Sequence, residues 1–175
     1  RVHYHRDYKE KTISSDEMVN KIKAMVKARK NPEFVIMART DSMRTEGYEE
    51  GMRRAKLFFE AGADVVKIFP NTLEEAKLAP SEVKGPLYYI NSIGNRVNRP
   101  VLSRDMASEF GYQFLSDAVG SMLTFSKAMK QYYKDWIKNG NSNLDFDEAI
   151  KLRKEIEDII GLEEMYKIEE ETVQI

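Results

Sequence analysis

The stretch FVIMARTDS (residues 34–42) places five apolar residues directly before a polar run that begins at Arg39. Because residues 34–38 contain no polar side chain, they predict a strand that is buried on both faces, as in a parallel sheet. Parallel α/β proteins collect their functional groups where strands end. The stretch therefore predicts the fold class and the place of a site together.

Helical and extended patterns surround this stretch on both sides. Ser14 and Glu17 have the spacing of a capping box, and the apolar residues that follow predict a helix at about residues 15–29. A second helix is expected at residues 46–61, with Gly62 suited to the left-handed position at its end. The other expected elements are strands at 64–70, 87–91 and 112–116 and helices at 72–78, 103–110, 117–138 and 145–160.

A strand followed by a helix, four times in succession, indicates a parallel α/β protein. Two architectures share this pattern, an open doubly wound sheet and part of a (β/α)8 barrel. A complete barrel takes about 250 residues, so 175 residues with four strands correspond to about half of one. Half a barrel leaves two strand edges unpaired, so a missing piece or a second chain is then expected to complete it. We treat residues 1–175 as one domain, with residues 141–175 as a C-terminal helix and tail.

The composition limits the classes of partner. The chain carries 28 Lys and Arg against 29 Asp and Glu, and a net charge of −1 favours neither nucleic acid nor an anionic membrane surface. No apolar run approaches the ~20 residues that span a bilayer. Cysteine is absent, which excludes disulfides, thiolate metal sites and cysteine nucleophiles and fits a cytoplasmic protein.

Polar side chains follow each expected strand, at the edge where parallel α/β proteins bind their ligands. They are Arg39, Thr40 and Asp41, then Asn71 and Thr72, then Asn91, Ser92 and Asn95, and finally Ser116 and Asp117. The planar guanidinium of Arg39 suits a carboxylate or a phosphate, and neighbouring amides and hydroxyls would orient the rest of a small anion. The alternative is that Arg39 and Asp41 only pair with each other and cap the loop into the next helix.

Two stretches, FVIMARTDS (34–42) and YEEGMRRAKLFFEAGAD (48–64), together resemble the isocitrate lyase/phosphoenolpyruvate mutase superfamily, above all its methylisocitrate lyase-like branch. The resemblance extends to SSDEMVNKIKAMVKARKNPE (14–33), LYYIN (87–91) and RPVLSRDMASEFGYQFL (99–115). It covers most of residues 12–130. It implies that the chain is the C-terminal half of a (β/α)8 barrel, four parallel strands with their helices, followed by C-terminal helices.

The resemblance also implies a function, a Mg²⁺-dependent lyase that cleaves a C–C bond of a small 2-hydroxy or 2-oxo carboxylic acid through an enolate. The family's Mg²⁺ ligands lie on strands that precede this chain, so the resemblance assigns no metal ligand here. By this resemblance Arg39 would contact the substrate carboxylate or oxyanion, and Asn91 would hydrogen-bond a carboxylate. From the polar residues that follow the strands, we also expect Ser92 and Asn71 to bind substrate. The family's last helices exchange between subunits, which suits residues 141–175 and a homo-oligomer.

Two departures from the family pattern leave the chemistry open. Where the lyases carry a cysteine acid/base, this chain begins RVHYHR, so His3 and His5 are the catalytic candidates, or Tyr4 in another register. Histidine suits this task because its unperturbed pKa is about 6.5; the alternative is that these are ordinary loop residues. The family has a glutamate near the end of the second strand, where this chain has Asn71, or Phe69 in another register; the replacement by Asn would remove a charge from the surroundings of the metal.

Three other interpretations follow from these departures. P–C chemistry of the phosphoenolpyruvate mutase or phosphonopyruvate hydrolase type does not need the cysteine. Lys67 lies within the apolar strand at 64–70, and a desolvated lysine inside a barrel can form a Schiff base, as in class I aldolases. That requires Lys67 to face inward, because on the outer face its ammonium would reach solvent. The non-enzymatic alternative is a half-barrel subunit without activity.

Overall fold

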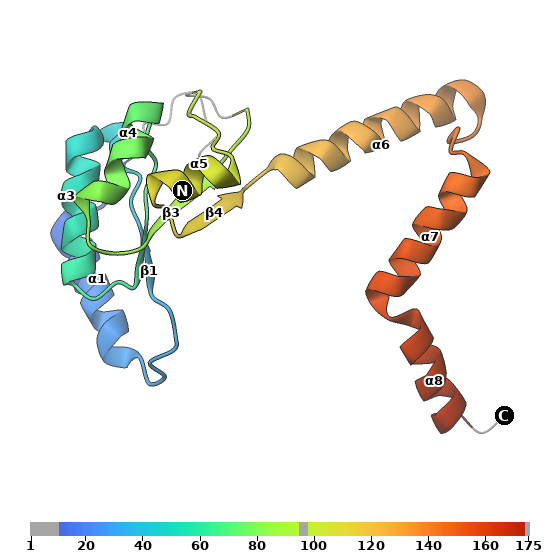
Figure 1. Ribbon diagram of the computed structural model, residues 1–175, viewed down its shortest axis with the longest axis horizontal. Coiled ribbons are helices and arrows are strands. Elements are labelled where there is room, and N and C mark those ends of the chain that lie inside the picture. Colours follow the sequence, from blue (N-terminus) through green and yellow to red (C-terminus); the bar gives the residue numbers. More distant parts are fainter. Residues whose placement is uncertain (1–10, 95–97, 174–175) are drawn as a thin grey trace. The chain divides into compact units, whose positions relative to one another are not determined.

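The structure is a computed structural model that describes residues 11–94 and 98–173 (Figure 1). The chain forms two compact units, of which the first ends at Leu123 and the second begins at Thr124. The first unit holds the sheet, and the second is helical. Within the described ranges, no helix is both long enough and apolar enough to cross a membrane.

Four parallel strands form one sheet whose spatial order is the order of the chain. They are β1 (Met37–Arg39), β2 (Val65–Lys67), β3 (Leu87–Asn91) and β4 (Phe114–Asp117). A doubly wound sheet reverses its strand order at a switch point, whereas a (β/α)8 barrel adds each strand beside the last. The sequential order confirms the predicted fold class, four parallel strands with helices wound as in part of a barrel.

The helices of the first unit connect these strands. They are α1 (Ser15–Ala28), α2 (Ser42–Thr45), α3 (Tyr48–Glu60), α4 (Leu73–Leu78), the 3₁₀ turn η1 (Ala79–Glu82) and α5 (Arg104–Phe110). Three of them begin at a side-chain cap, and Ser103 is that cap for α5. The Ser14 side chain accepts a hydrogen bond from the backbone N–H of Glu17, and Thr72 and Glu75 form a complete capping box.

The helix predicted at residues 46–61 differs at its start. Gly47 has a backbone φ of 95°, which ends the short helix α2 and lets α3 begin at Tyr48. The end agrees with the prediction, since Gly62 directly follows the C-cap with a φ of 99°. A side chain at Gly62 would also meet Val26 of α1, because a Cβ there would lie 2.9 Å from that residue's Cγ2.

The core lies on one face of the sheet, where helices cover it; Figure 1 shows α1, α3 and α4 on one side of the strands. The strand residues Ala38, Val66 and Leu87 are fully buried there. Tyr89 and Tyr112 meet edge to face, with ring centroids 5.2 Å apart, and the Tyr112 hydroxyl donates to the carbonyl of Ala76 on α4. Burial of such large side chains stabilises the fold by about 1.5–3 kcal/mol each.

The opposite face of the sheet, which we call the open face, carries Met37, Arg39, Lys67, Tyr88 and Phe114. Residues paired across neighbouring parallel strands point to the same side, and Arg39, Lys67, Tyr88 and Phe114 are paired in this way. Met37 and Phe114 are 43% and 44% exposed there. Helices pack against the other face of the sheet and bury its side chains. Within the described residues of the first unit, no helix buries Met37 and Phe114 in this way.

The prediction that residues 34–38 form a strand buried on both faces was therefore wrong. Strand β1 begins at Met37, and Phe34 and Val35 before it are 66% and 57% exposed. Strand β1 is an edge strand of the described sheet, and it alternates exposed and buried side chains. An apolar run therefore indicated a strand but not how many of its faces this chain covers.

The second unit contains α7 (Phe146–Ile160), α8 (Leu162–Thr172) and most of α6 (Gly120–Asn139). Helix α6 begins three residues later than predicted, because the carboxylate of Asp117 accepts hydrogen bonds from the backbone N–H groups of Val119 and Gly120. On α6, Trp136 stacks on Tyr132 with ring centroids 6.2 Å apart. Gly161, in the left-handed conformation, joins α7 to α8.

Candidate active site

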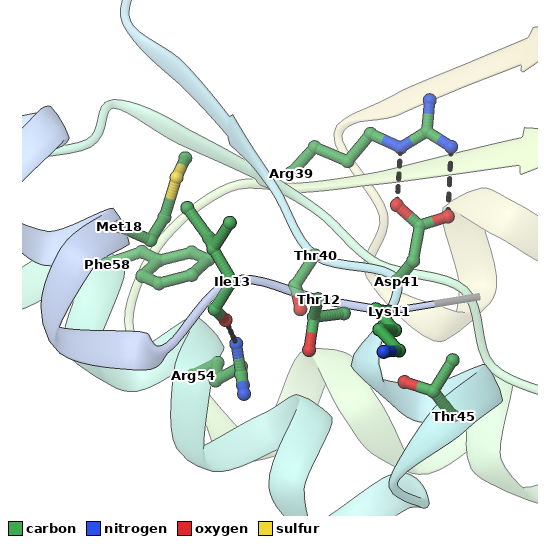
Figure 2. Close-up of a pocket in the computed structure, with 10 residues that line it drawn as sticks. All are labelled: Lys11, Thr12, Ile13, Met18, Arg39, Thr40, Asp41, Thr45, Arg54 and Phe58. Atoms are coloured by element: carbon green, nitrogen blue, oxygen red, sulfur yellow. Dashed lines mark hydrogen bonds and ion pairs between the residues drawn. The ribbon is translucent and has the colours of Figure 1, made fainter. Parts of the chain in front are cut away.

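The site is built at the carboxyl end of β1, where Arg39 and Asp41 form a fork of two hydrogen bonds (Figure 2). Nε and Nη2 of Arg39 donate to the two carboxylate oxygens of Asp41, each at 2.9 Å. The Arg39 side chain is 40% exposed, whereas that of Asp41 is 9% exposed. The fork fixes the guanidinium in one plane and leaves Nη1 outside it. Nη1 of Arg44 lies 3.7 Å from the same carboxylate.

The two hydroxyls of the same stretch serve the backbone turn. Thr40 Oγ1 lies 2.7 Å from Ser42 Oγ and also accepts a hydrogen bond from the backbone N–H of Ser42. Both residues are buried, at 4% and 0% exposure. Residues 39–42 therefore have two roles. Thr40 and Ser42 stabilise the turn, and Arg39 and Asp41 form the charged group of the site.

Four cations gather near Asp41, and we call Arg39, Arg44, Lys67 and Arg99 the cationic cluster. Three of them lie over the ring of Phe69. The guanidinium carbons of Arg39 and Arg99 lie 4.6 and 4.9 Å from the centroid of that ring, and the Lys67 ammonium lies 5.9 Å from it. Arg99 is 6% exposed, and its Nη2 donates to the carbonyl of Ile90 at the end of β3. Sequence reasoning missed Arg99, because its place depends on the path of the loop after β3.

The charges of this cluster influence one another. The pKa of Lys67 is lowered, first by burial and then by the positive charges of Arg39 and Arg99, while Asp41 opposes that shift. Burial likewise lowers the pKa of Arg99. Cations that are partly removed from water favour an anionic ligand close to them.

A cavity of about 210 Å³ borders Arg39, Thr40 and Asp41, with the segment Lys11–Ile13 along its rim (Figure 2). Arg54 of α3 holds this segment in place. Its Nη1 donates to the carbonyl of Ile13 at 2.6 Å. The same guanidinium donates to two carboxylates. One is Glu50 of α3, at 2.7 Å, and the other is Glu46, the residue before Gly47, at 3.0 Å. The Arg54 side chain is 7% exposed, so this is a nearly buried ionic anchor.

Asn91 and Asn71, both predicted to bind substrate, are hydrogen-bonded to the backbone of the chain. The Asn91 amide donates to the carbonyl of Leu102 and accepts from its N–H. The Asn71 amide donates to the carbonyl of Met43. Asn91 follows Leu87 and Tyr89 at intervals of two, which places it on the covered face of β3 and not on the open face. Their part in substrate binding stays a prediction.

Ser92 follows directly after β3 and is half-buried. His3 and His5, the predicted catalytic residues, and Tyr4 lie outside the described residues, as does Asn95. The structure therefore brings together Arg39, Asp41 and Lys67 from the ends of β1 and β2, and adds Arg44 and Arg99 to them.

Divalent metal ions of the Mg²⁺ class need oxygen ligands, usually carboxylates. Among residues 11–94 and 98–173, no group of three or more His, Asp or Glu side chains could hold such an ion. The carboxylate of Asp41 is already paired with two arginines. We therefore assign no metal ligand among the described residues, and the place of the Mg²⁺ ligands stays a prediction.

Comparison with known proteins places this site in context. The family model of phosphoenolpyruvate phosphomutase matches residues 3–135. The chain is 32% identical over 158 residues to the 2,3-dimethylmalate lyase of Eubacterium barkeri, covering 90% of this chain and 54% of that protein. It is also 32% identical over 151 residues to the 2-methylisocitrate lyase of Vibrio cholerae, covering 82% of this chain and 48% of that one. The chain spans about half the length of these curated relatives.

Solved structures agree with these matches. One is a crystal structure of 2,3-dimethylmalate lyase, described as a member of the PEP mutase/isocitrate lyase superfamily. It matches this chain with a TM-score of 0.77 at 26% identity, and the match covers 92% of this chain and 56% of the lyase chain. A structure of oxaloacetate acetylhydrolase in complex with 3,3-difluorooxalacetate matches with a TM-score of 0.81 at 22% identity, over 91% of this chain and 54% of the hydrolase chain. This likeness supports the fold described above. The chain belongs to the phosphoenolpyruvate phosphomutase family, within the PEP mutase/isocitrate lyase superfamily.

Proposed function

We propose that the protein is a lyase that cleaves a C–C bond of a small 2-hydroxy or 2-oxo carboxylic acid, with Arg39 as the group that binds its carboxylate or oxyanion. The observation that carries this proposal is the fork between Arg39 and Asp41 at the end of β1, beside Lys67 and Arg99 around Phe69. Family membership supports it, since the matched relatives include two lyases of such acids.

The chemistry needs a preorganised positive charge. When the C–C bond next to a carboxylate-bearing carbon breaks, its electron pair remains on one fragment as an enolate, and negative charge develops on oxygen. A cation that is already in place stabilises this charge without rearrangement. Arg39 satisfies that condition, because Asp41 and the ring of Phe69 fix its guanidinium before any ligand arrives. The enolate then takes up a proton, for which His3 and His5 remain the predicted donors.

The proposal includes Mg²⁺ as cofactor, held by carboxylates outside the described residues, where it would supply further positive charge to the enolate oxygen. It also includes a homo-oligomer, or completion of the sheet by a further half, and a cytoplasmic location. The basis for completion is the sheet itself, whose edge strands β1 and β4 each have one neighbour among the described strands.

A substrate panel tests the activity directly. The protein is incubated with Mg²⁺ and, in turn, 2,3-dimethylmalate, 2-methylisocitrate, oxaloacetate and phosphonopyruvate, and products are measured by mass spectrometry. We expect turnover of at least one of the first two acids. Turnover of phosphonopyruvate alone would favour P–C chemistry, and turnover of none by a folded, Mg²⁺-supplied protein would favour the non-catalytic half-barrel.

A further inference from the structure

Lys67 lies on the open face of the sheet, at the end of β2. It is paired in register with Arg39 of β1 and with Tyr88 of β3, so the three side chains share that face. Its ammonium lies 4.4 Å from the centroid of the Tyr88 ring and 5.9 Å from that of Phe69. The Lys67 side chain is thus held over aromatic rings at the carboxyl ends of the strands, away from the helix-covered face.

The charged groups that face Lys67 come from three elements. They are Arg39 at the end of β1, Asp41 directly after it, and Arg99 from the loop that follows β3. Partial burial and the two guanidinium groups disfavour the charged ammonium and lower its pKa, and Asp41 acts in the opposite direction. A lysine beside other cations and partly removed from water offers the neutral amine more readily than an exposed lysine, and the neutral amine is the nucleophile.

The neighbouring arginine determines which ligand this amine would meet. Neighbouring strands lie about 4.8 Å apart, and in a 2-oxo acid the carboxylate and the carbonyl are on adjacent carbons. One small molecule can therefore place its carboxylate against Arg39 and its carbonyl carbon against Lys67. We propose that Lys67 forms a Schiff base with 2-oxo acids whose carboxylate is bound by Arg39, an activity separate from the lyase reaction proposed above.

The step is a condensation that needs no further reagent. The lone pair of the Lys67 amine attacks the carbonyl carbon, a C–N bond forms, and the carbonyl oxygen leaves as water. That water carries one hydrogen of the amine and one proton from solvent, and the iminium nitrogen keeps the other hydrogen. The positive iminium can then accept electrons from the neighbouring carbon, which is how Schiff-base enzymes activate 2-oxo acids.

Reductive trapping tests the proposal on the whole protein. The protein is treated with pyruvate and sodium borohydride, and the reduced adduct is located by intact mass and peptide mapping. We expect labelling at Lys67. Lys67→Arg keeps the positive charge and removes the amine, so its adduct should disappear. Arg39→Ala should raise the pyruvate concentration for half-labelling about tenfold or more, because a charged hydrogen bond to the carboxylate is lost.

Lys23→Arg is the matched control, since Lys23 is an exposed residue of helix α1 and its replacement should leave labelling unchanged. Thermal unfolding by circular dichroism shows that each variant is folded. Absence of an adduct at Lys67 in the folded protein at saturating pyruvate overturns the proposal, as does equal labelling in Lys67→Arg. Trapping does not depend on C–C cleavage. A negative result in the substrate panel therefore contradicts only the lyase proposal, and a negative trapping result contradicts only the Schiff-base proposal.

Discussion

Asn91 and Leu102 are joined by two hydrogen bonds, in which the Asn91 amide pairs with both the N–H and the carbonyl of the Leu102 backbone, at 2.9 and 2.8 Å. The two residues close the loop that carries Arg99 to the cationic cluster. Asn91 is 8% exposed, so this closure takes place away from water.

Asn91→Ala should therefore act on stability. It leaves a buried N–H and a buried carbonyl of Leu102 without their partner, and we expect a loss of about 2–3 kcal/mol in the free energy of unfolding. Urea unfolding followed by circular dichroism measures it. Asn20→Ala, on the exposed surface of α1, is the control and should change little. A stability loss near zero for Asn91→Ala would show that its amide is free for a ligand.

Arg39→Ala should reduce activity with little effect on folding. We expect kcat/KM on the best substrate of the panel to fall by about 30- to 150-fold, equivalent to about 2–3 kcal/mol of transition-state binding. Asp41→Asn, which keeps one acceptor for the arginine, should cost less. The double variant should lose less than the sum of the two, because both act through the same fork.

The control for this series is Arg104→Ala, because the side chain of Arg104 is 92% exposed on α5. Its steady-state kinetics should match those of the original protein. Kinetics of Arg39→Ala that match the control would mean that Arg39 only pairs with Asp41.

Arg54→Met should loosen the segment at the rim of the cavity. It removes the bond to the Ile13 carbonyl and leaves two carboxylates, Glu46 and Glu50, without their shared partner. Loss of one member of a nearly buried ionic group costs about 2–4 kcal/mol. Arg53→Met, one residue earlier on the same helix and 52% exposed, should cost less than about 1 kcal/mol. Equal effects in urea unfolding would contradict the anchoring role of Arg54.

Glu50 makes stability depend on pH. Its pKa is lowered to about 2, chiefly by the hydrogen bond from Arg53 and also by Arg54, while burial opposes the shift. A carboxyl group whose pKa is lower in the folded chain stabilises the fold above its unfolded pKa of about 4.5, and this contribution disappears as pH falls to about 2. Glu50→Gln should therefore reduce the slope of unfolding free energy against pH in that window, and a slope equal to that of the original protein would contradict this contribution.

The sequence was sufficient to predict most of the strands and helices of the first unit, because apolar runs, helical periodicity and caps are local. It did not predict α2 or α8, and residues 162–172 were expected to belong to a tail. Ser14 caps its helix as expected, and successive apolar runs form a parallel sheet in chain order. The sequence pattern did not predict that Phe34 and Val35 are exposed, because the burial of an apolar run depends on which other elements pack against it.

The site divides in the same way. The charged end of β1 was predicted from the run at Arg39. Arg39 does pair with Asp41, and because its side chain is 40% exposed, its binding of a substrate anion stays a prediction. The face occupied by Lys67 required the register of β1 against β2. The pairing of Asn91 with Leu102 and the arrival of Arg99 depend on a loop whose path no periodic pattern encodes.

The stacking of Trp136 on Tyr132 has a spectroscopic consequence. Trp136 is the single tryptophan of the chain and belongs to the unit that begins at Thr124. Tryptophan fluorescence will therefore report on the helices of that unit, whereas the sheet must be followed through near-ultraviolet ellipticity of aromatic pairs such as Tyr89 and Tyr112. Recording both signals in one thermal melt shows whether the two units lose their structure at one temperature or in separate steps.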